Sequence, residues 1–257
     1  MRLDEHIRAR REDRAILLMT HIVIGYPTLE KSLALVDAMV EAGVDLMELQ
    51  IPFSEPIADG PVILHANQEA LRHGTTVAQC FEAAEHVAKR HAIPFVFMSY
   101  YNILFKYGLE RFAARTAAAG LTGAIVPDCP PEEAAEYRAS MDRHGLDPIF
   151  IFSPRTPDAR LRMLGEAGRG FVYAVARKGV TGAETSFSSD LSAYLERCRA
   201  ATRLPLAVGF GVKERSDVEF LVGKADIAVV GSQSLRLFDE GGAGAVRDFL
   251  ASLVQRA

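Results

Sequence analysis

The chain of 257 residues contains little cysteine: Cys80, Cys129 and Cys198 are odd in number and lie far apart. Such spacing fits neither a disulfide framework nor a zinc site, and it suits a reducing cytoplasm. We therefore expect a cytoplasmic protein without structural disulfides.

Long apolar runs and a strong net charge are also missing. No apolar stretch approaches the roughly 20 residues that span a bilayer, and the charged start, MRLDEHIRARREDRA, lacks the apolar core of a signal peptide. The net charge of −4 gives no electrostatic attraction to nucleic acid or to an anionic membrane. We expect an ordinary globular protein with neither nucleic acid nor membrane as a partner.

Short apolar runs of strand length alternate with amphipathic stretches. The expected strands lie near Ile16–Ile24, Val44–Ile51, Pro94–Tyr100, Gly123–Val126, Pro148–Phe152, Gly170–Ala176, Leu204–Phe210 and Asp226–Gly231. The expected helices lie near Glu30–Ala42, Val77–Arg90, Leu109–Ala119, Pro131–Arg143, Ala159–Ala167, Asp190–Thr202, Glu214–Val222 and Ala243–Val254.

This alternation predicts an α/β protein with a parallel sheet. The strands are apolar on both faces, which is typical of strands covered by helices. Eight such units favour a closed (β/α)8 TIM barrel over an open doubly wound sheet. We expect a single domain over residues 1–257, with an extra N-terminal helix at Leu3–Arg11 covering the bottom of the barrel.

Two carboxylates stand close together in the segment from Glu48 to Pro61. Glu48 lies in an apolar strand that predicts its burial, and Asp59 lies in the proline-braced loop that follows. One such acid alone is more simply explained as the partner of a core arginine or as a turn cap. Two together favour an acid–base pair, because burial raises one pKa while polar surroundings keep the other group ionised.

Small-residue loops follow the last three expected strands. They read RKGVTGAE at 177–184, VGFGV at 208–212 and VGS at 230–232. Glycines at this end of a barrel let backbone N–H groups surround an anion, and Ser232 offers a hydroxyl as well. We therefore expect a substrate with a phosphate monoester. The first loop is long and polar, a candidate lid whose Thr181 would hydrogen-bond a catalytic carboxylate when closed.

Two other chemistries are disfavoured by the positions of lysine and histidine. A Schiff-base aldolase needs a lysine inside the barrel, but none of the six lysines falls in an expected strand. A metal-dependent lyase needs clustered histidines, and only His21 of the seven lies in a strand. Acid–base chemistry without a metal or other cofactor remains.

The segments Glu48–Pro61, VTGAE at 180–184, GFG at 209–211 and GS at 231–232 resemble the tryptophan synthase α subunit family. The resemblance covers essentially the whole chain. It implies a (β/α)8 barrel that cleaves indole-3-glycerol phosphate to indole and glyceraldehyde 3-phosphate without a cofactor. It also implies docking on a β subunit that carries pyridoxal phosphate.

The resemblance also implies roles for individual residues. Glu48 would move protons, Asp59 would bind the indole N–H, Tyr173 would lie beside the reacting carbons, and Thr181 would orient the aspartate. The implied phosphate-binding residues are Gly182, Gly211, Gly231 and Ser232. The implied indole pocket contains His21, Met98, Tyr100, Ile125, Ile151 and Phe210.

Several positions depart from the family pattern, among them Pro127, where a small residue is normal. Gln50 replaces a glycine, Glu55 an aspartate that faces the β subunit, Tyr26 a loop aspartate, and His21 an aromatic residue that contacts indole. Three alternatives therefore stand beside the α-subunit role. They are a stand-alone lyase for the same substrate, a lyase or isomerase for a related phosphorylated substrate, and a catalytically silent scaffold.

Overall fold

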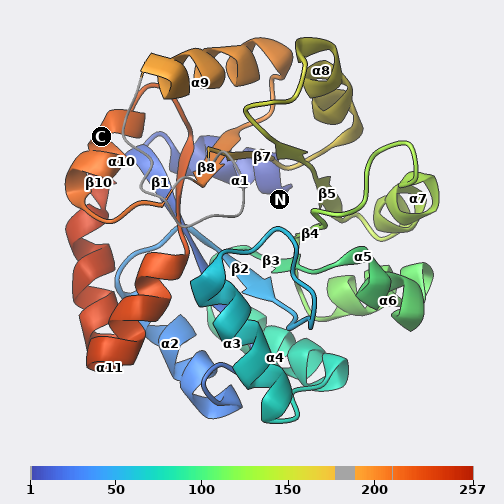
Figure 1. Ribbon diagram of the computed structural model, residues 1–257, viewed down its shortest axis with the longest axis vertical. Coiled ribbons are helices and arrows are strands. Elements are labelled where there is room, and N and C mark those ends of the chain that lie inside the picture. Colours follow the sequence, from blue (N-terminus) through green and yellow to red (C-terminus); the bar gives the residue numbers. More distant parts are fainter. Residues whose placement is uncertain (1, 177–188, 210, 257) are drawn as a thin grey trace.

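The structure, a computed structural model, describes residues 2–176, 189–209 and 211–256. Parallel strands form a central ring, and helices surround it on all sides (Figure 1). The strands are β1 (Arg14–Val23), β2 (Leu46–Gln50), β3 (Phe95–Met98), β4 (Gly123–Ile125), β5 (Asp147–Ile149), β6 (Ile151–Phe152), β7 (Val172–Val175), β8 (Leu206–Gly209), β9 (Ile227–Val230) and β10 (Gln255–Arg256).

The expected strand Pro148–Phe152 is interrupted. Its halves, β5 and β6, are separated by Phe150, and they form the two ends of the order β5-β4-β3-β2-β1-β9-β8-β7-β6. Because β5 pairs with β4 and β6 pairs with β7, one segment of chain closes the ring. The (β/α)8 barrel is thus confirmed, with β10 as an unexpected antiparallel strand against the start of β1.

The helices of the described ranges mostly match expectation. They are α1 (Leu3–Arg10), α2 (Leu29–Glu41), α3 (Pro61–Arg72), α4 (Val77–Arg90), α5 (Tyr101–Tyr107), α6 (Leu109–Ala118), α7 (Ala135–Arg143), α8 (Asp158–Ala167), α9 (Ser189–Ala201), α10 (Arg215–Leu221) and α11 (Ser232–Leu253). None of these helices is long and apolar enough to cross a membrane.

Three helix predictions need correction. The helix expected from Pro131 begins at Ala135, because residues 131–133 form a turn. The helix expected at Ala243–Val254 is the second part of α11, which bends at Gly242. Helices α3 and α5 were not among those expected, although Gly60 and Pro61 form a favourable start for α3.

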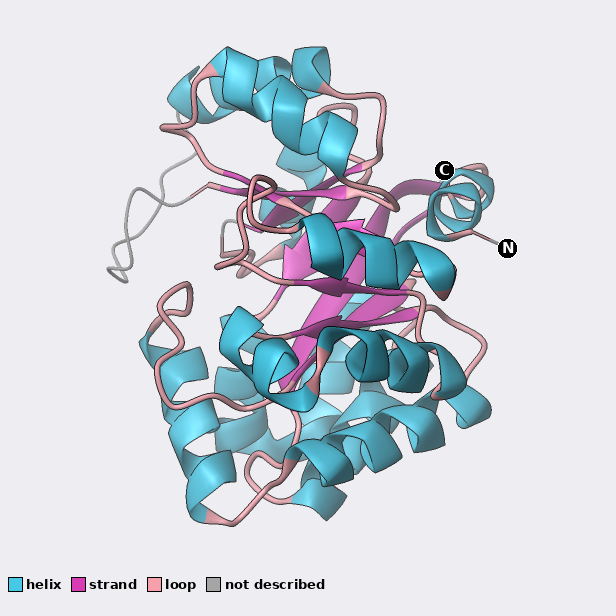
Figure 2. Cartoon of the chain, turned by 90° about the vertical axis from the view of Figure 1, so that its right-hand side faces the viewer, coloured by secondary structure: helices cyan, strands magenta, loops and turns pink. Residues whose placement is uncertain are grey.

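The apolar core has two parts. One lies between the helices and the outer face of the sheet, and the other fills the barrel interior, where Leu17, Met19 and Ile227 pack together. Leu3 and Ile7 of α1 join this inner cluster, so α1 closes the end of the barrel where the strands begin, as expected. In the side view the two chain ends lie close together at this end (Figure 2), where β10 pairs with the start of β1. The carboxyl ends of the strands, and the predicted site, face the opposite way.

Candidate active site

Glu48 lies inside the barrel, paired across the sheet with a histidine. Its side chain is buried, and the parallel register places Glu48 of β2 beside His21 of β1. The His21 Nδ1 and Glu48 Oε2 atoms are 3.3 Å apart. The partner of Glu48 is therefore an imidazole, and the simpler expectation of a core arginine is wrong.

Asp59 is held in a loop that is fixed from two sides. The Asn67 side chain of α3 accepts a hydrogen bond from the Phe53 backbone N–H at 2.9 Å, and the Tyr100 hydroxyl accepts one from the Ala58 N–H at 3.1 Å. The rings of Phe53 and Tyr100 stack with their centroids 5.1 Å apart. These contacts hold the loop between β2 and α3 and keep the Asp59 carboxylate buried.

Gln50 connects the strand to this loop. Its Nε2 donates to Asp59 Oδ2 at 2.7 Å and lies 3.3 Å from Asn67 Oδ1. Burial raises the pKa of Asp59, and although Gln50 and the nearby His21 charge act in the opposite direction, the pKa remains above its usual range. Sequence reasoning noted Gln50 only as a departure from the family. Asn67 was not predicted. It is a polar residue on the buried face of α3, and the sequence does not show that this position is buried.

The other described residues of the predicted catalytic centre and indole pocket lie in the barrel interior. Tyr173 of β7 faces the barrel interior, and burial together with the Glu48 charge raises its pKa well above the usual range. The same inner cluster contains the apolar members of the predicted indole pocket, namely Met98, Tyr100, Ile125 and Ile151. These side chains form one apolar cluster inside the barrel.

The described part of the predicted phosphate site lies at the ends of two adjacent strands. Gly211 follows β8, and Gly231 and Ser232 join β9 to the first turn of α11. Gly231 lies against His21 of β1, because a Cβ placed on it would be 3.7 Å from the Cβ of His21. Three predicted residues lie outside the described residues: Gly182 of the phosphate site, the lid residue Thr181 and the indole-pocket residue Phe210.

Gly209 leaves the space that Tyr173 occupies. A Cβ at this position would lie 2.7 Å from the Tyr173 hydroxyl oxygen and 2.9 Å from its Cε1. We expect Gly209→Ala to displace Tyr173, to lower catalytic activity, and to reduce the free energy of unfolding by about 1–3 kcal/mol, as overpacking does. Urea unfolding measures the stability change.

The matched control is Gly244→Ala, where nothing lies within 4 Å of the added Cβ. This substitution in α11 should be neutral or stabilising, because alanine favours a helix over glycine. Equal stability of the two variants would show that Tyr173 moves aside at no cost.

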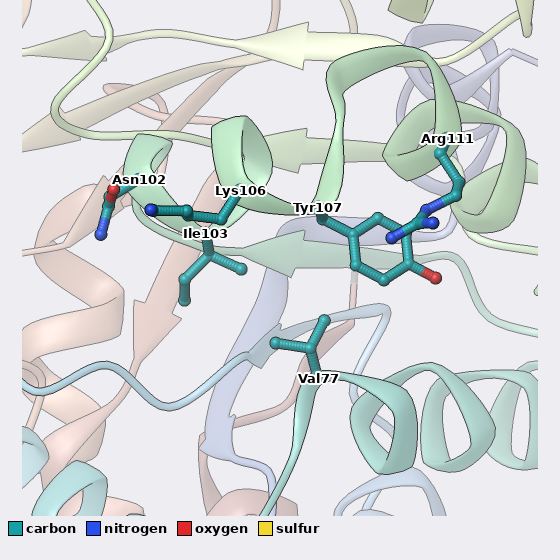
Figure 3. A pocket seen from close by; sticks show the side chains of 6 residues that line it. All are labelled: Val77, Asn102, Ile103, Lys106, Tyr107 and Arg111. Atoms are coloured by element: carbon teal, nitrogen blue, oxygen red, sulfur yellow. The ribbon is translucent and has the colours of Figure 1, made fainter.

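The described residues contain no group of three or more His, Cys, Asp or Glu side chains arranged to hold a metal ion. A separate hollow of about 290 Å³ lies outside the barrel between α4, α5 and α6 (Figure 3). Its lining is neutral or cationic: Val77, Asn102, Ile103, Lys106, Tyr107 and Arg111. It contains none of the predicted site residues.

A closed barrel with two buried carboxylates next to glycine-rich strand ends defines an acid–base enzyme of the (β/α)8 class. Residues 7–252 match the family model described as tryptophan synthase alpha chain. The chain is 63% identical over 251 residues to the tryptophan synthase alpha chain of Syntrophotalea carbinolica, covering 98% of this chain and 99% of that one. The corresponding protein of Desulforapulum autotrophicum is 59% identical over 251 residues, with the same coverage.

Solved structures agree. A chain of Mycobacterium tuberculosis tryptophan synthase superposes with a TM-score of 0.92 at 35% identity, covering 98% of this chain and 96% of that one. A chain of the tryptophan synthase complex from Pyrococcus furiosus gives 0.85 at 30% identity, covering 94% and 98%. The chain belongs to the tryptophan synthase alpha chain family, and its expected class, a carbon–carbon lyase of tryptophan biosynthesis, follows from that membership.

Proposed function

We propose that Glu48 and Asp59 carry the cleavage of indole-3-glycerol phosphate to indole and glyceraldehyde 3-phosphate. The observation that supports this most is the arrangement of two buried carboxylates, each with its own hydrogen-bonding partner, at one end of the barrel. The reaction breaks one carbon–carbon bond without oxidation or reduction. A proton must reach the indole ring carbon, and the side-chain hydroxyl must lose one as the aldehyde forms.

Glu48 is the proton carrier in this proposal, and Asp59 accepts a hydrogen bond from the ring N–H. A carboxylate at the ring nitrogen stabilises the positive charge that develops there when the ring carbon is protonated. Met98, Tyr100, Ile125 and Ile151 then contact the ring, and Tyr173 lies beside the reacting carbons. Gly211, Gly231 and Ser232 bind the phosphate together with Gly182. Thr181 orients Asp59, and Phe210 belongs to the indole pocket.

Indole release by the purified chain tests this function. We expect indole to form from indole-3-glycerol phosphate, and we expect the dephosphorylated substrate to show a higher KM. A chain that releases no indole, alone or with a β subunit, would contradict the proposed function. Equal KM values for the two substrates would instead contradict only the phosphate site.

We further propose that the active-site end of the barrel docks on a β subunit that carries pyridoxal phosphate. Ile57 in the Asp59 loop is 68% exposed and Phe105 of α5 is 65% exposed. The Ala58–Tyr100 hydrogen bond ties that loop to the residue just before α5. Exposed large apolar side chains on adjoining segments are typical of a protein interface.

Replacing each of these two side chains by aspartate tests the interface. We expect Ile57→Asp and Phe105→Asp to weaken binding of the β subunit by about tenfold or more, because each removes an apolar anchor, while indole release by the free chain changes little. Titration calorimetry with a purified β subunit measures the affinity. Val222→Asp is the control, since Val222 is also exposed but follows α10.

Unchanged affinity in both interface variants would contradict this location of the docking surface. A wild-type chain that does not bind the β subunit would favour the alternative of a stand-alone lyase. For the location, we propose the cytoplasm, because the three cysteines are buried and free, as a reducing compartment allows. We also propose that residues 1–257 form a single domain.

A further inference from the structure

His21 contacts Glu48 but has no role in the reaction proposed above. The residue lies on β1 between Glu48 of β2 and Gly231 at the end of β9, and its side chain is buried. On the same face of β1, Met19 two residues earlier is apolar and buried, as is Leu17 before it. A polar ring among such neighbours is costly to bury unless its nitrogens are used.

The geometry assigns one nitrogen of His21 to Glu48. Nδ1 lies 3.3 Å from Glu48 Oε2, and since a carboxylate only accepts, Nδ1–H is the donor. Among the described residues, Glu48 Oε1 and His21 Nε2 have no hydrogen-bond partner although both are buried. One oxygen of the carboxylate is thus held, and the other is left for the substrate.

Gln50 does the same for the second carboxylate. Its Nε2 donates to Asp59 Oδ2 at 2.7 Å, and the Asp59 loop is held by Tyr100 and Asn67. Each acid of the site therefore has one oxygen fixed by a side chain of β1 or β2. Such fixing matters because the efficiency of proton transfer depends on the geometry of the carboxylate toward the reacting atom.

We propose that His21 is a positioning residue for Glu48: it donates Nδ1–H to Oε2, so that Oε1 is the oxygen that exchanges protons with the substrate. This inference rests on the proposed role of Glu48. It deepens that role by naming the oxygen that acts and the side chain that selects it.

The charge on His21 adds a pH dependence. The groups facing it are Glu48 from β2, Asp59 from the following loop and the neutral Gln50, while Tyr173 from β7 faces Glu48. Burial lowers the pKa of His21, but the hydrogen bond and charge of Glu48, with the charge of Asp59, outweigh it and raise the pKa above its ordinary 6.5. The imidazolium present below that pKa weakens Glu48 as a base, so kcat should rise with pH as His21 loses its proton.

Two substitutions separate positioning from packing. His21→Phe keeps a ring of similar size but has no donor. His21→Asn places an amide N–H near the position of Nδ1–H and does not titrate. We expect His21→Phe to lower kcat for indole release about 10- to 100-fold, the loss expected for one hydrogen bond to a charged group, with little change in KM. We expect His21→Asn to recover most of that loss.

The pH profile supplies the second readout. The wild-type kcat should show a transition above pH 6.5 that both variants lack, and the exposed-histidine control His86→Asn should retain it. Thermal unfolding checks that all variants are folded. A His21→Phe variant with wild-type kcat, or a His21→Asn variant no better than His21→Phe, would overturn the inference.

A measurement without turnover separates this inference from the proposed function. NMR titration of His21 should show a lower pKa in Glu48→Gln than in the wild type, because the raising charge is gone. An unchanged pKa would overturn the pairing even in an active enzyme. If the wild type releases no indole but the pKa falls as expected, the proposed function fails and the contact between His21 and Glu48 stands.

Discussion

Glu48→Gln should abolish indole formation while the protein still binds a phosphate ester. The amide keeps the shape of the side chain and can still accept the hydrogen bond from His21 Nδ1, but it cannot carry a proton. General acid–base catalysis contributes about 10²- to 10⁴-fold to a rate, so we expect kcat to fall by at least that factor. Steady-state indole release measures kcat, and calorimetry with glycerol 3-phosphate measures binding.

The control for this variant is Glu55→Gln, the same change at an exposed carboxylate in the following loop. It should retain wild-type kcat in the absence of a β subunit. A Glu48→Gln enzyme with near wild-type turnover would remove Glu48 from the mechanism. Loss of phosphate-ester binding in that variant would instead point to a disturbed barrel interior.

Asp59→Asn should lower activity and raise stability together. The amide oxygen of the new side chain can still accept the hydrogen bond from Gln50, but the charge that we propose to face the ring N–H is lost. Removing one preorganised electrostatic contact at a reacting centre costs about 10²- to 10³-fold in rate, which we expect in kcat/KM. A gain in stability from loss of a site charge is a common trade-off between activity and stability.

The stability gain follows from the pKa of Asp59, which burial raises above its ordinary 3.8. Because the folded state holds this proton more tightly than the unfolded chain, ionised Asp59 costs stability at neutral pH. The cost disappears as the pH falls through the raised pKa toward 3.8. Each 1 kcal/mol gained corresponds to a rise in Tm of about 2–4 °C for a chain near this size.

Calorimetric scans from neutral pH down to pH 4 test this sign. The Tm difference between Asp59→Asn and the wild type should be positive at pH 7 and should shrink as the pH falls. Asp13→Asn, at an exposed position before β1, should give no such difference. An Asp59→Asn protein less stable than the wild type at pH 7 would show that the contact with Gln50 needs the charged carboxylate.

The barrel was predictable because its signals are local. Apolar runs of strand length and their regular spacing place the strands, and the burial of Glu48 follows from the apolar residues around it in β2. The breaks in the prediction are local as well. Phe150 divides β5 from β6 where the ring closes. The unexpected helix α3 begins at the proline-rich loop after β2, and α5 follows closely on β3.

The sequence alone determined the fold class, the two carboxylates and the loop that carries Asp59, since each is visible within a short segment. The tertiary structure decided which groups hold those acids. His21 meets Glu48 across 27 positions of chain because β1 and β2 pair in one register. Asn67 and Tyr100 meet the Asp59 loop from α3 and from the end of β3. Strand register and helix placement are set by packing over the whole barrel, so no short segment of sequence contains them.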